Sequence, residues 1–114
     1  MNGRVKAMMD KAKKKRLEAK GWKIGTTTDF LDLSAEEARY IELKLALSDH
    51  LRRRRERKHL TQMQLAKMLS SSQSRVAKME AGDPSVSLDL LIRSLLTLGA
   101  SDRDLAKVIA TANW

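Results

Sequence analysis

Residues 60–82 constrain the fold of this chain more than any other segment. The side chains of Thr61 and Ser72 can each cap a helix, which predicts two short helices at residues 62–69 and 73–81. Ser70 and the serine after it supply a tight polar turn between them, and Gly82 can end the second helix. The expected inner faces are apolar and consist of Leu65, Ala66, Met68 and Leu69 on the first helix and Val76 and Met79 on the second.

The rest of the chain also favours helices. Only 4% of the residues are aromatic, so the core must consist mainly of Leu, Met, Ala, Ile and Val, most of which are good helix formers. One Pro and five Gly occur, and no run alternates strictly between apolar and polar residues as a strand would. We therefore expect an all-α fold.

Three further helices are marked by their caps. Ser34 and Glu37 have the spacing of a capping box, which predicts a long helix from there to about Lys58. Ser87 can cap a helix that Gly99 ends, and Ser101 can cap a final one. These signals predict a five-helix domain at residues 34–114. The first of these helices has a wide apolar stripe, the second carries five apolar residues and the third begins with three; they are Ala38, Ile41, Leu43, Leu45, Leu47 and Leu51, then Leu88, Leu91, Ile92, Leu95 and Leu98, then Leu105, Val108 and Ile109.

Residues 1–33 form a separate part of the chain, a basic N-terminal arm with a connecting segment. Residues 4–20 are compatible with a lysine-rich helix, and Gly21 is a suitable cap for its end. Such a helix could touch a membrane surface, but its apolar face is weak, which favours a flexible helix or one ordered by a partner. Apolar residues at 22–33 are expected to pack the arm onto the domain.

The positive charge of the chain is concentrated in two blocks. The net charge is +9, with +7 in residues 1–23 and +7 in residues 51–82, whereas residues 24–50 carry −4 and residues 83–114 carry −1. A surface that only needs to be soluble intersperses the two signs. Segregation of this kind indicates a polyanionic partner, and the second block coincides with the two short helices.

Composition also excludes several classes of protein. The absence of Cys rules out disulfides, Cys-based zinc fingers and thiol catalysis, and two His residues are too few for a His-based metal site. No apolar run approaches the length of about 20 residues that a membrane span needs, and no secretory signal is recognisable. No Gly-rich phosphate loop or catalytic constellation is present. We expect a soluble cytoplasmic protein that is not an enzyme and that binds no metal or cofactor.

Two short helices, a tight turn and adjacent positive charge are the requirements of a helix-turn-helix that enters the major groove of double-stranded DNA. In this geometry the first turn of residues 73–81 faces the bases. Gln73 can form bidentate hydrogen bonds with adenine, and Arg75 or Lys78 can reach guanine. Ser74 is short and can serve a nearby base or phosphate.

The matching residues resemble those of the lambda-repressor/Cro-like helix-turn-helix domain of the xenobiotic-response-element (XRE) family, over about residues 43–99. They are Leu60, Thr61, Gln62, Leu65, Ala66, Leu69, Ser72, Gln73, Ser74, Val76, Met79, Glu80, Gly82, Ser87 and Leu88. One departure is Ser70, which stands where the family usually has Gly in the turn. A left-handed conformation at Ser70 would cost about 1 kcal/mol or somewhat more.

The resemblance implies roles for several residues. Gln73, Ser74 and Lys78 occupy positions that face the bases, whereas Arg75 points between bases and backbone. Gln62 lies at a helix N-terminus that binds a DNA phosphate, and the neighbouring caps Thr61 and Ser72 are expected to bind phosphate as well. Of the four consecutive arginines 52–55, which span one helical turn and cannot all face DNA, we assign Arg52 and Arg53 to phosphate.

Less specific interpretations exist for the same residues. Gln73 and Ser74 could be solvated first-turn residues, and Glu80 is expected to bond within the domain. His50 and His59 are expected to be surface or cap residues. The others of the arginine run are expected to be solvated or paired with acids.

Two functions share these DNA-binding residues. The first is a transcriptional regulator, most simply a repressor, that binds a two-fold symmetric operator as a homodimer, with Leu105, Val108, Ile109 and Trp114 at the dimer contact. The second is an antitoxin. Residues 21–34 and the helix around residues 42–47 resemble the N-terminal extension of HigA-type antitoxins, which implies a RelE-like ribonuclease toxin as partner. The strongly basic arm argues against docking on a cationic RNA-binding toxin.

Overall fold

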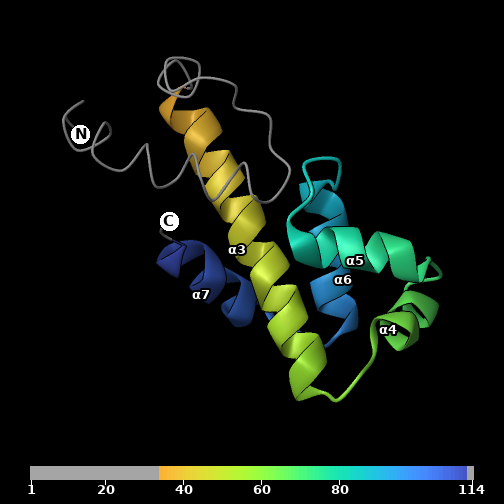
Figure 1. Cartoon of the computed structure of the whole chain (residues 1–114). Coiled ribbons are helices and arrows are strands. Elements are labelled where there is room, and N and C mark those ends of the chain that lie inside the picture. The colour runs from red at the N-terminus through yellow and green to blue at the C-terminus, as the bar shows by residue number, and fades with distance from the viewer. Residues whose placement is uncertain (1–33, 113–114) are drawn as a thin grey trace.

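The computed structural model describes residues 34–112, which form five helices and contain no strand (Figure 1). The helices are α3 (Ala35–Arg57), α4 (Gln62–Met68), α5 (Gln73–Ala81), α6 (Leu88–Thr97) and α7 (Asp102–Thr111). The all-α prediction is therefore confirmed. The arm at residues 1–33 and Trp114 lie outside the described residues, so the predictions for them remain predictions.

The long helix α3 is the element on which the others pack. Helices α5 and α6 lie along one side of it and α7 along another, while α4 packs against α5 (Figure 1). The core lies between α3, α4, α5 and α6. Its fully or nearly fully buried side chains are Leu47, Leu51, Leu65, Ala66, Val76, Met79, Val86, Leu91, Leu95, Leu98 and Ala100.

Serine and threonine caps start every helix, as the sequence predicted. The hydroxyl oxygens of Ser34, Thr61, Ser72, Ser87 and Ser101 each accept a hydrogen bond from the backbone N–H three residues later. The expected capping box at the start of α3 is only half formed, because Glu37 does not return a bond to Ser34. Complete boxes occur instead at α4 and α7.

One predicted core residue is wrong. Met68 is 49% exposed, whereas Leu65 and Ala66 are buried and Leu69 is partly buried. At 3.6 residues per turn, the centre of the buried face of α4 lies near Leu69, and Met68 falls about 100° away from it. The same geometry places Gln62 over the buried face at the start of α4.

Four helices end in the same hydrogen-bonded turn. After α4, Ser70 donates its N–H to the Lys67 carbonyl at 3.2 Å and Ser71 donates to the Ala66 carbonyl at 2.8 Å, which is a Schellman motif. This motif needs a left-handed residue. Gly82 and Gly99 take that position after α5 and α6, but His59 (φ 56°) takes it after α3 and Ser70 (φ 52°) after α4.

The sequence indicates only what a left-handed Ser70 would cost, and the structure has that conformation there. The left-handed His59 was not expected. A non-glycine residue in this conformation costs about 1–2 kcal/mol because Cβ approaches the following carbonyl oxygen. The surrounding hydrogen bonds and the packing of Leu60 and Leu69 on the core stabilise both turns nevertheless.

A buried lysine connects α3 with the loop after α5. Lys44 is only 6% exposed, and its Nζ donates to the Pro84 carbonyl oxygen at 3.3 Å. Burial lowers the pKa of Lys44, and the nearby Asp83 carboxylate opposes that effect. The bond draws the loop at residues 83–86 against α3, next to the helix that carries the predicted base-reading residues.

Polar contacts join helix α7 to α3. Asp104 accepts from Arg54 at 2.8 Å, and Arg39 donates to the Ile109 carbonyl oxygen at 2.9 Å and to that of Ala112. No residue of α7 is fully buried, and Ile109 is 41% exposed. Helix α7 is therefore the least deeply packed of the five described helices.

We expect Ser70→Gly to stabilise the protein by about 0.5–1 kcal/mol, because glycine removes most of the cost of the left-handed conformation. Ser71→Gly is the matched control. Ser71 does not have a positive φ, so glycine there should lower stability by a few tenths of a kcal/mol through added freedom of the unfolded chain. Urea unfolding measures both variants, and a stabilising Ser71→Gly or a destabilising Ser70→Gly would contradict this account of the turn.

Candidate nucleic-acid interface

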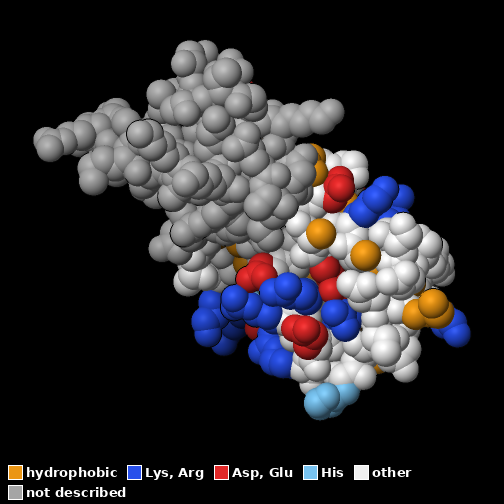
Figure 2. Space-filling view, viewed as in Figure 1, with side chains coloured by type: hydrophobic (Ala, Val, Ile, Leu, Met, Phe, Trp, Pro, Cys, Tyr) orange, Lys and Arg blue, Asp and Glu red, His pale blue; other side chains and the backbone are white. Residues whose placement is uncertain are grey.

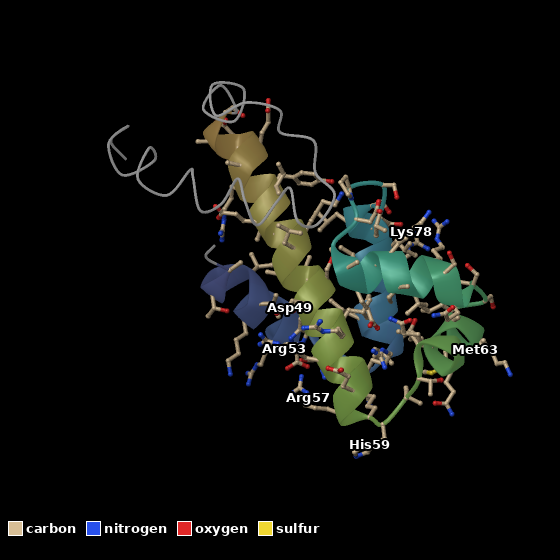
Figure 3. All side chains as sticks on the ribbon, in the orientation of Figure 1. Asp49, Arg53, Arg57, His59, Met63 and Lys78 are labelled. Carbon is tan, nitrogen blue, oxygen red and sulfur yellow. The ribbon has the colours of Figure 1, made fainter. Side chains whose placement is uncertain are left out.

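The exposed face of α5 carries the predicted base-reading residues. Gln73, Ser74, Arg75 and Lys78 are all exposed, whereas Val76 and Met79 on the opposite face are completely buried. Lys78 and, on the adjacent α4, Met63 lie away from the α3 arginines in Figure 3. The four candidates are thus all exposed within the first six residues of α5, and the buried Val76 and Met79 anchor this helix on the core.

A chain of hydrogen bonds joins this face to the interior. The Gln73 side-chain amide donates to the Gln62 carbonyl oxygen at 2.9 Å, and the Gln62 amide donates to the Glu80 carboxylate at 3.1 Å. The same carboxylate accepts two bonds from Arg55, at 2.5 and 2.9 Å. The four side chains come from α3, α4 and α5 and form one continuous path.

This path determines how Gln73 presents its amide. The carboxylate of Glu80 can only accept, so the NH₂ group of Gln62 must face it and the Gln62 oxygen must face Gln73. Gln73 then has to turn its own NH₂ group towards Gln62. Its carbonyl oxygen and its second N–H are left as one acceptor and one donor, the pair that matches the N6 and N7 edge of adenine.

The ion pair between Arg55 and Glu80 is almost completely buried. The side chain of Arg55 is 12% exposed and that of Glu80 is 3% exposed. The hydrogen bond to Glu80 raises the pKa of Arg55, so the guanidinium group of Arg55 stays protonated. A further bond from Arg55 to the Leu60 carbonyl oxygen, at 2.7 Å, ties the turn before α4 to the pair. The expectation that Glu80 bonds within the domain is confirmed.

A second feature of the interface is a hollow of about 220 Å³ beside α5. It is lined by Ser74, Arg75 and Lys78 of the helix and by Ser85 of the following loop, together with Ser72 and Val86. Sequence reasoning missed Ser85. Its position is set by Asp83, which accepts from both the N–H and the hydroxyl of Ser85, at 2.8 and 2.6 Å. These bonds lower the pKa of Asp83.

The candidate phosphate-binding residues occupy different surroundings. Thr61 and Ser72 use their hydroxyl oxygens to cap α4 and α5, which leaves each hydroxyl hydrogen free to donate. Gln62 uses its oxygen and one N–H in the hydrogen-bonded chain and keeps one N–H. These three residues lie at the helix starts beside Gln73.

The four arginines 52–55 divide among three environments. Arg55 pairs with Glu80 and Arg54 with Asp104, whereas Arg52 and Arg53 are exposed and share Asp49, at 3.3 and 2.9 Å. Arg53 also lines a groove between α3 and α7. The structure does not bring it to the face of α5, and its role in phosphate binding remains a prediction.

Other kinds of site are absent from the described part of the chain. Within residues 34–112 no three His, Asp or Glu side chains are grouped so that they could hold a metal ion. None of the five described helices combines the length and the apolar character that crossing a bilayer requires.

We expect Glu80→Ala to destabilise the protein by about 3–5 kcal/mol, because it leaves the Arg55 guanidinium buried without its partner. Arg93→Ala is the control. It removes an ion pair with Asp89 in which both side chains are more than two-thirds exposed, and it should change stability by no more than about 0.5 kcal/mol. Chemical denaturation gives both values. Similar losses in the two variants would mean that the buried pair is not a special support of the fold.

Comparison with known proteins agrees with this geometry. A family model described as "Helix-turn-helix domain" matches residues 46–108, which include the C-terminal part of α3, all of α4, α5 and α6, and most of α7. Neither the curated proteins nor the solved structures contain a significant match. The match spans more than half of the chain, and the protein belongs to the helix-turn-helix domain family, whose members bind DNA.

Proposed function

We propose that the protein is a transcriptional regulator, acting as a repressor, that binds a two-fold symmetric DNA operator as a homodimer. The observation that carries the proposal is the oriented amide of Gln73. An exposed glutamine that only needs solvation has no reason to be held by Gln62, Glu80 and Arg55 in succession. A fixed donor and acceptor at the start of α5 are what a base-reading residue requires.

In the proposed complex, α5 lies in the major groove with its first turn towards the bases. Gln73 reads an adenine, and Ser74 and Lys78, which lie one helical turn apart, face the bases next to it. Arg75 contacts guanine or the backbone. The hollow that Ser85 shares with these residues receives a phosphate at the edge of the groove.

Backbone contacts fix the position of the helix on the duplex. Thr61, Gln62 and Ser72 donate to one strand from the junction of α4 and α5. Arg52 and Arg53 at the end of α3 add electrostatic attraction, in part offset by Asp49.

A single recognition helix contacts only a few base pairs, so the proposal includes a dimer whose half-sites lie about 34 Å apart. Helix α7 is proposed as the contact between protomers. It packs mainly on α3, its apolar residues Leu105 and Val108 are only partly buried, and Ile109 is exposed. Association of two such helices would cover this apolar surface.

The HigA-type antitoxin hypothesis depends mainly on residues 21–34, of which only Ser34 is among the described residues. Nothing in residues 34–112 favours a RelE-like toxin as partner over DNA. Co-expression with a toxin-like neighbouring gene tests the hypothesis, since an antitoxin would restore growth.

We expect Gln73→Ala to lose about 1–3 kcal/mol of operator affinity, at one base position in each half-site, because the lost bonds are specific to one base. Selection of bound sequences from a random duplex pool identifies the operator, and competition binding with single-base variants locates the loss. Gln62→Ala should produce part of the same loss at the same position, because it frees the Gln73 amide. The two losses should not be additive.

Arg52→Ala is the control for this experiment. It should weaken binding to all sequences alike and reduce the slope of log affinity against log salt by about 1. A uniform loss for Gln73→Ala would show that Gln73 does not read a base.

The dimer contact is tested with Ile109→Asp. A carboxylate at this exposed apolar position should prevent association, so that sedimentation gives a monomer while the helical content is unchanged. Leu96→Asp is the matched control, because Leu96 is similarly exposed, at 48%, but lies on α6. If Leu96→Asp separates the protomers and Ile109→Asp does not, the contact lies elsewhere than on α7.

A further inference from the structure

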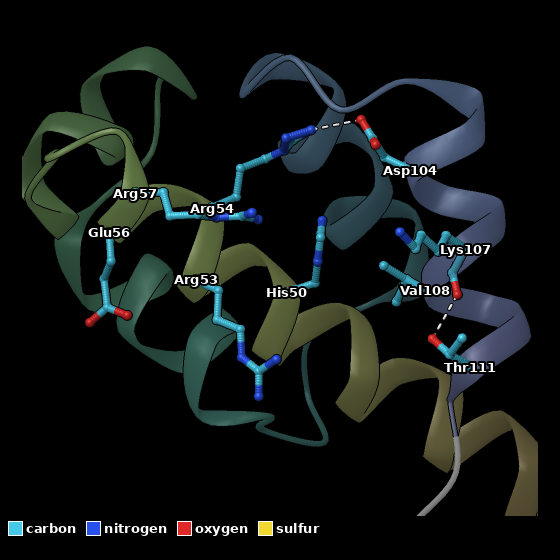
Figure 4. A pocket seen from close by; sticks show the side chains of 9 residues that line it. All are labelled: His50, Arg53, Arg54, Glu56, Arg57, Asp104, Lys107, Val108 and Thr111. Carbon is cyan, nitrogen blue, oxygen red and sulfur yellow. Dashed lines mark hydrogen bonds and ion pairs between the residues drawn. The ribbon is translucent and has the colours of Figure 1, made fainter.

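A groove of about 710 Å³ runs between α3 and α7, outside the face that carries Gln73 (Figure 4). Its charged lining consists of Arg53, Arg54, Arg57 and Lys107 against Glu56 and Asp104, which is a formal net charge of +2. His50 and Val108 also line it. Figure 2 shows the corresponding region as a cluster of Lys and Arg side chains with a few acids among them.

Two buried nitrogen atoms at the groove have no hydrogen-bond partner. They are Nε2 of His50 and Nε of Arg54. The Arg54 Nε–H can only donate, and the remainder of that guanidinium is held by Asp104 at 2.8 Å. Leaving a buried donor unsatisfied is unfavourable, and native structures rarely do so without an unseen partner. The Arg54 Nε–H therefore lacks an acceptor, whereas His50 Nε2 lacks either an acceptor or a donor, according to the tautomer of the ring.

Two of the basic side chains that line the groove form no ion pair within residues 34–112. Arg57 and Lys107 reach the groove from opposite helices, and neither forms an ion pair with any residue in the described range 34–112. Arg53 and Arg54 are already paired, with Asp49 and Asp104. The uncompensated positive charge of the groove therefore lies on its two walls.

We propose that this groove binds the phosphate group of a small phosphate monoester. Such a group carries a charge of about −1.5 to −2 at neutral pH and has three oxygens that accept strong hydrogen bonds. Its charge matches the net charge of the lining. Its oxygens can accept from Arg57 and Lys107, the cations of the two walls, and guanidinium groups suit phosphate geometry.

The Asp104 carboxylate does not obstruct this site. Asp104 is already occupied, because it accepts from the Ser101 N–H and from Arg54, and these bonds hold its pKa far below the usual range. It stays ionised and fixes the Arg54 side chain through the bond to its guanidinium group. No residue of α4 or α5 lines the groove, and of its lining residues only Arg53 is also assigned to operator phosphate.

Titration of the full-length protein with inorganic phosphate tests the proposal, with the histidine ring resonances followed by NMR at constant ionic strength set by chloride. The chain has only two histidines, so His59, which does not line the groove, is an internal control. We expect saturable shifts at His50 and none at His59. Equal shifts with chloride alone, or shifts at both histidines, would overturn the proposal.

The same titration reports the protonation of His50. Burial and the neighbouring Arg53, Arg54 and Arg57 lower the pKa of His50, while Asp104 raises it. Lys107 faces the ring from α7 (Figure 4). A bound phosphate adds negative charge beside the ring, so the pKa of His50 should rise in phosphate relative to chloride.

Lys107→Gln and Arg57→Gln should each weaken phosphate binding about tenfold, the loss typical of one charge-assisted hydrogen bond. Arg103→Gln is the matched control, because it removes the same charge from α7 at an exposed position outside the groove, and it should bind phosphate normally. An equal effect of Arg103→Gln would show that phosphate is attracted by the overall positive charge of the protein and not by this groove. Displacement of bound phosphate by duplex DNA, with weaker DNA binding by Lys107→Gln, would instead make the groove part of the DNA surface.

Discussion

The buried ion pair between Arg55 and Glu80 is the interaction on which the rest of the DNA-binding surface depends. It joins α3 to the end of α5, and through the Leu60 carbonyl it also holds the turn before α4. Because the Glu80 carboxylate pairs with Arg55, it can only accept hydrogen bonds, and this dictates the orientation of Gln62 and then of Gln73. Through two successive hydrogen bonds, the buried Glu80 carboxylate therefore determines which atoms of the exposed Gln73 amide remain free to donate and to accept.

Two turns of the domain contain a residue in an unfavourable backbone conformation. The turns before α4 and before α5 each contain a non-glycine residue in the left-handed region, His59 and Ser70. Glycine would relieve both, but the hydrogen bonds of each Schellman motif and the burial of the adjacent leucines maintain the turns without it. Ala66 of α4 and Val76 of α5 both belong to the core that these turns bring together.

The four consecutive arginines of α3 point in different directions and therefore have different partners. At about 100° per residue, four successive side chains point in four directions, so one faces the α5 side, one faces α7 and two face solvent. The arginine that faces α7 has one nitrogen without a partner. The positive block of the sequence thus serves the fold, the DNA-binding surface and, by our inference, a separate phosphate site.

The sequence by itself determined the helices, their serine and threonine caps and the core positions of Ala66, Val76 and Met79, because all of these follow from local periodicity and capping. It also indicated Gln73, Ser74, Arg75 and Lys78, all in the first six residues of α5, as candidates for base reading. Only the tertiary structure decided that Glu80 selects Arg55 among four adjacent arginines, that Ser85 joins the α5 hollow and that Met68 is exposed. These outcomes depend on which helix faces pack against one another, and the spacing of residues along the chain does not contain that information.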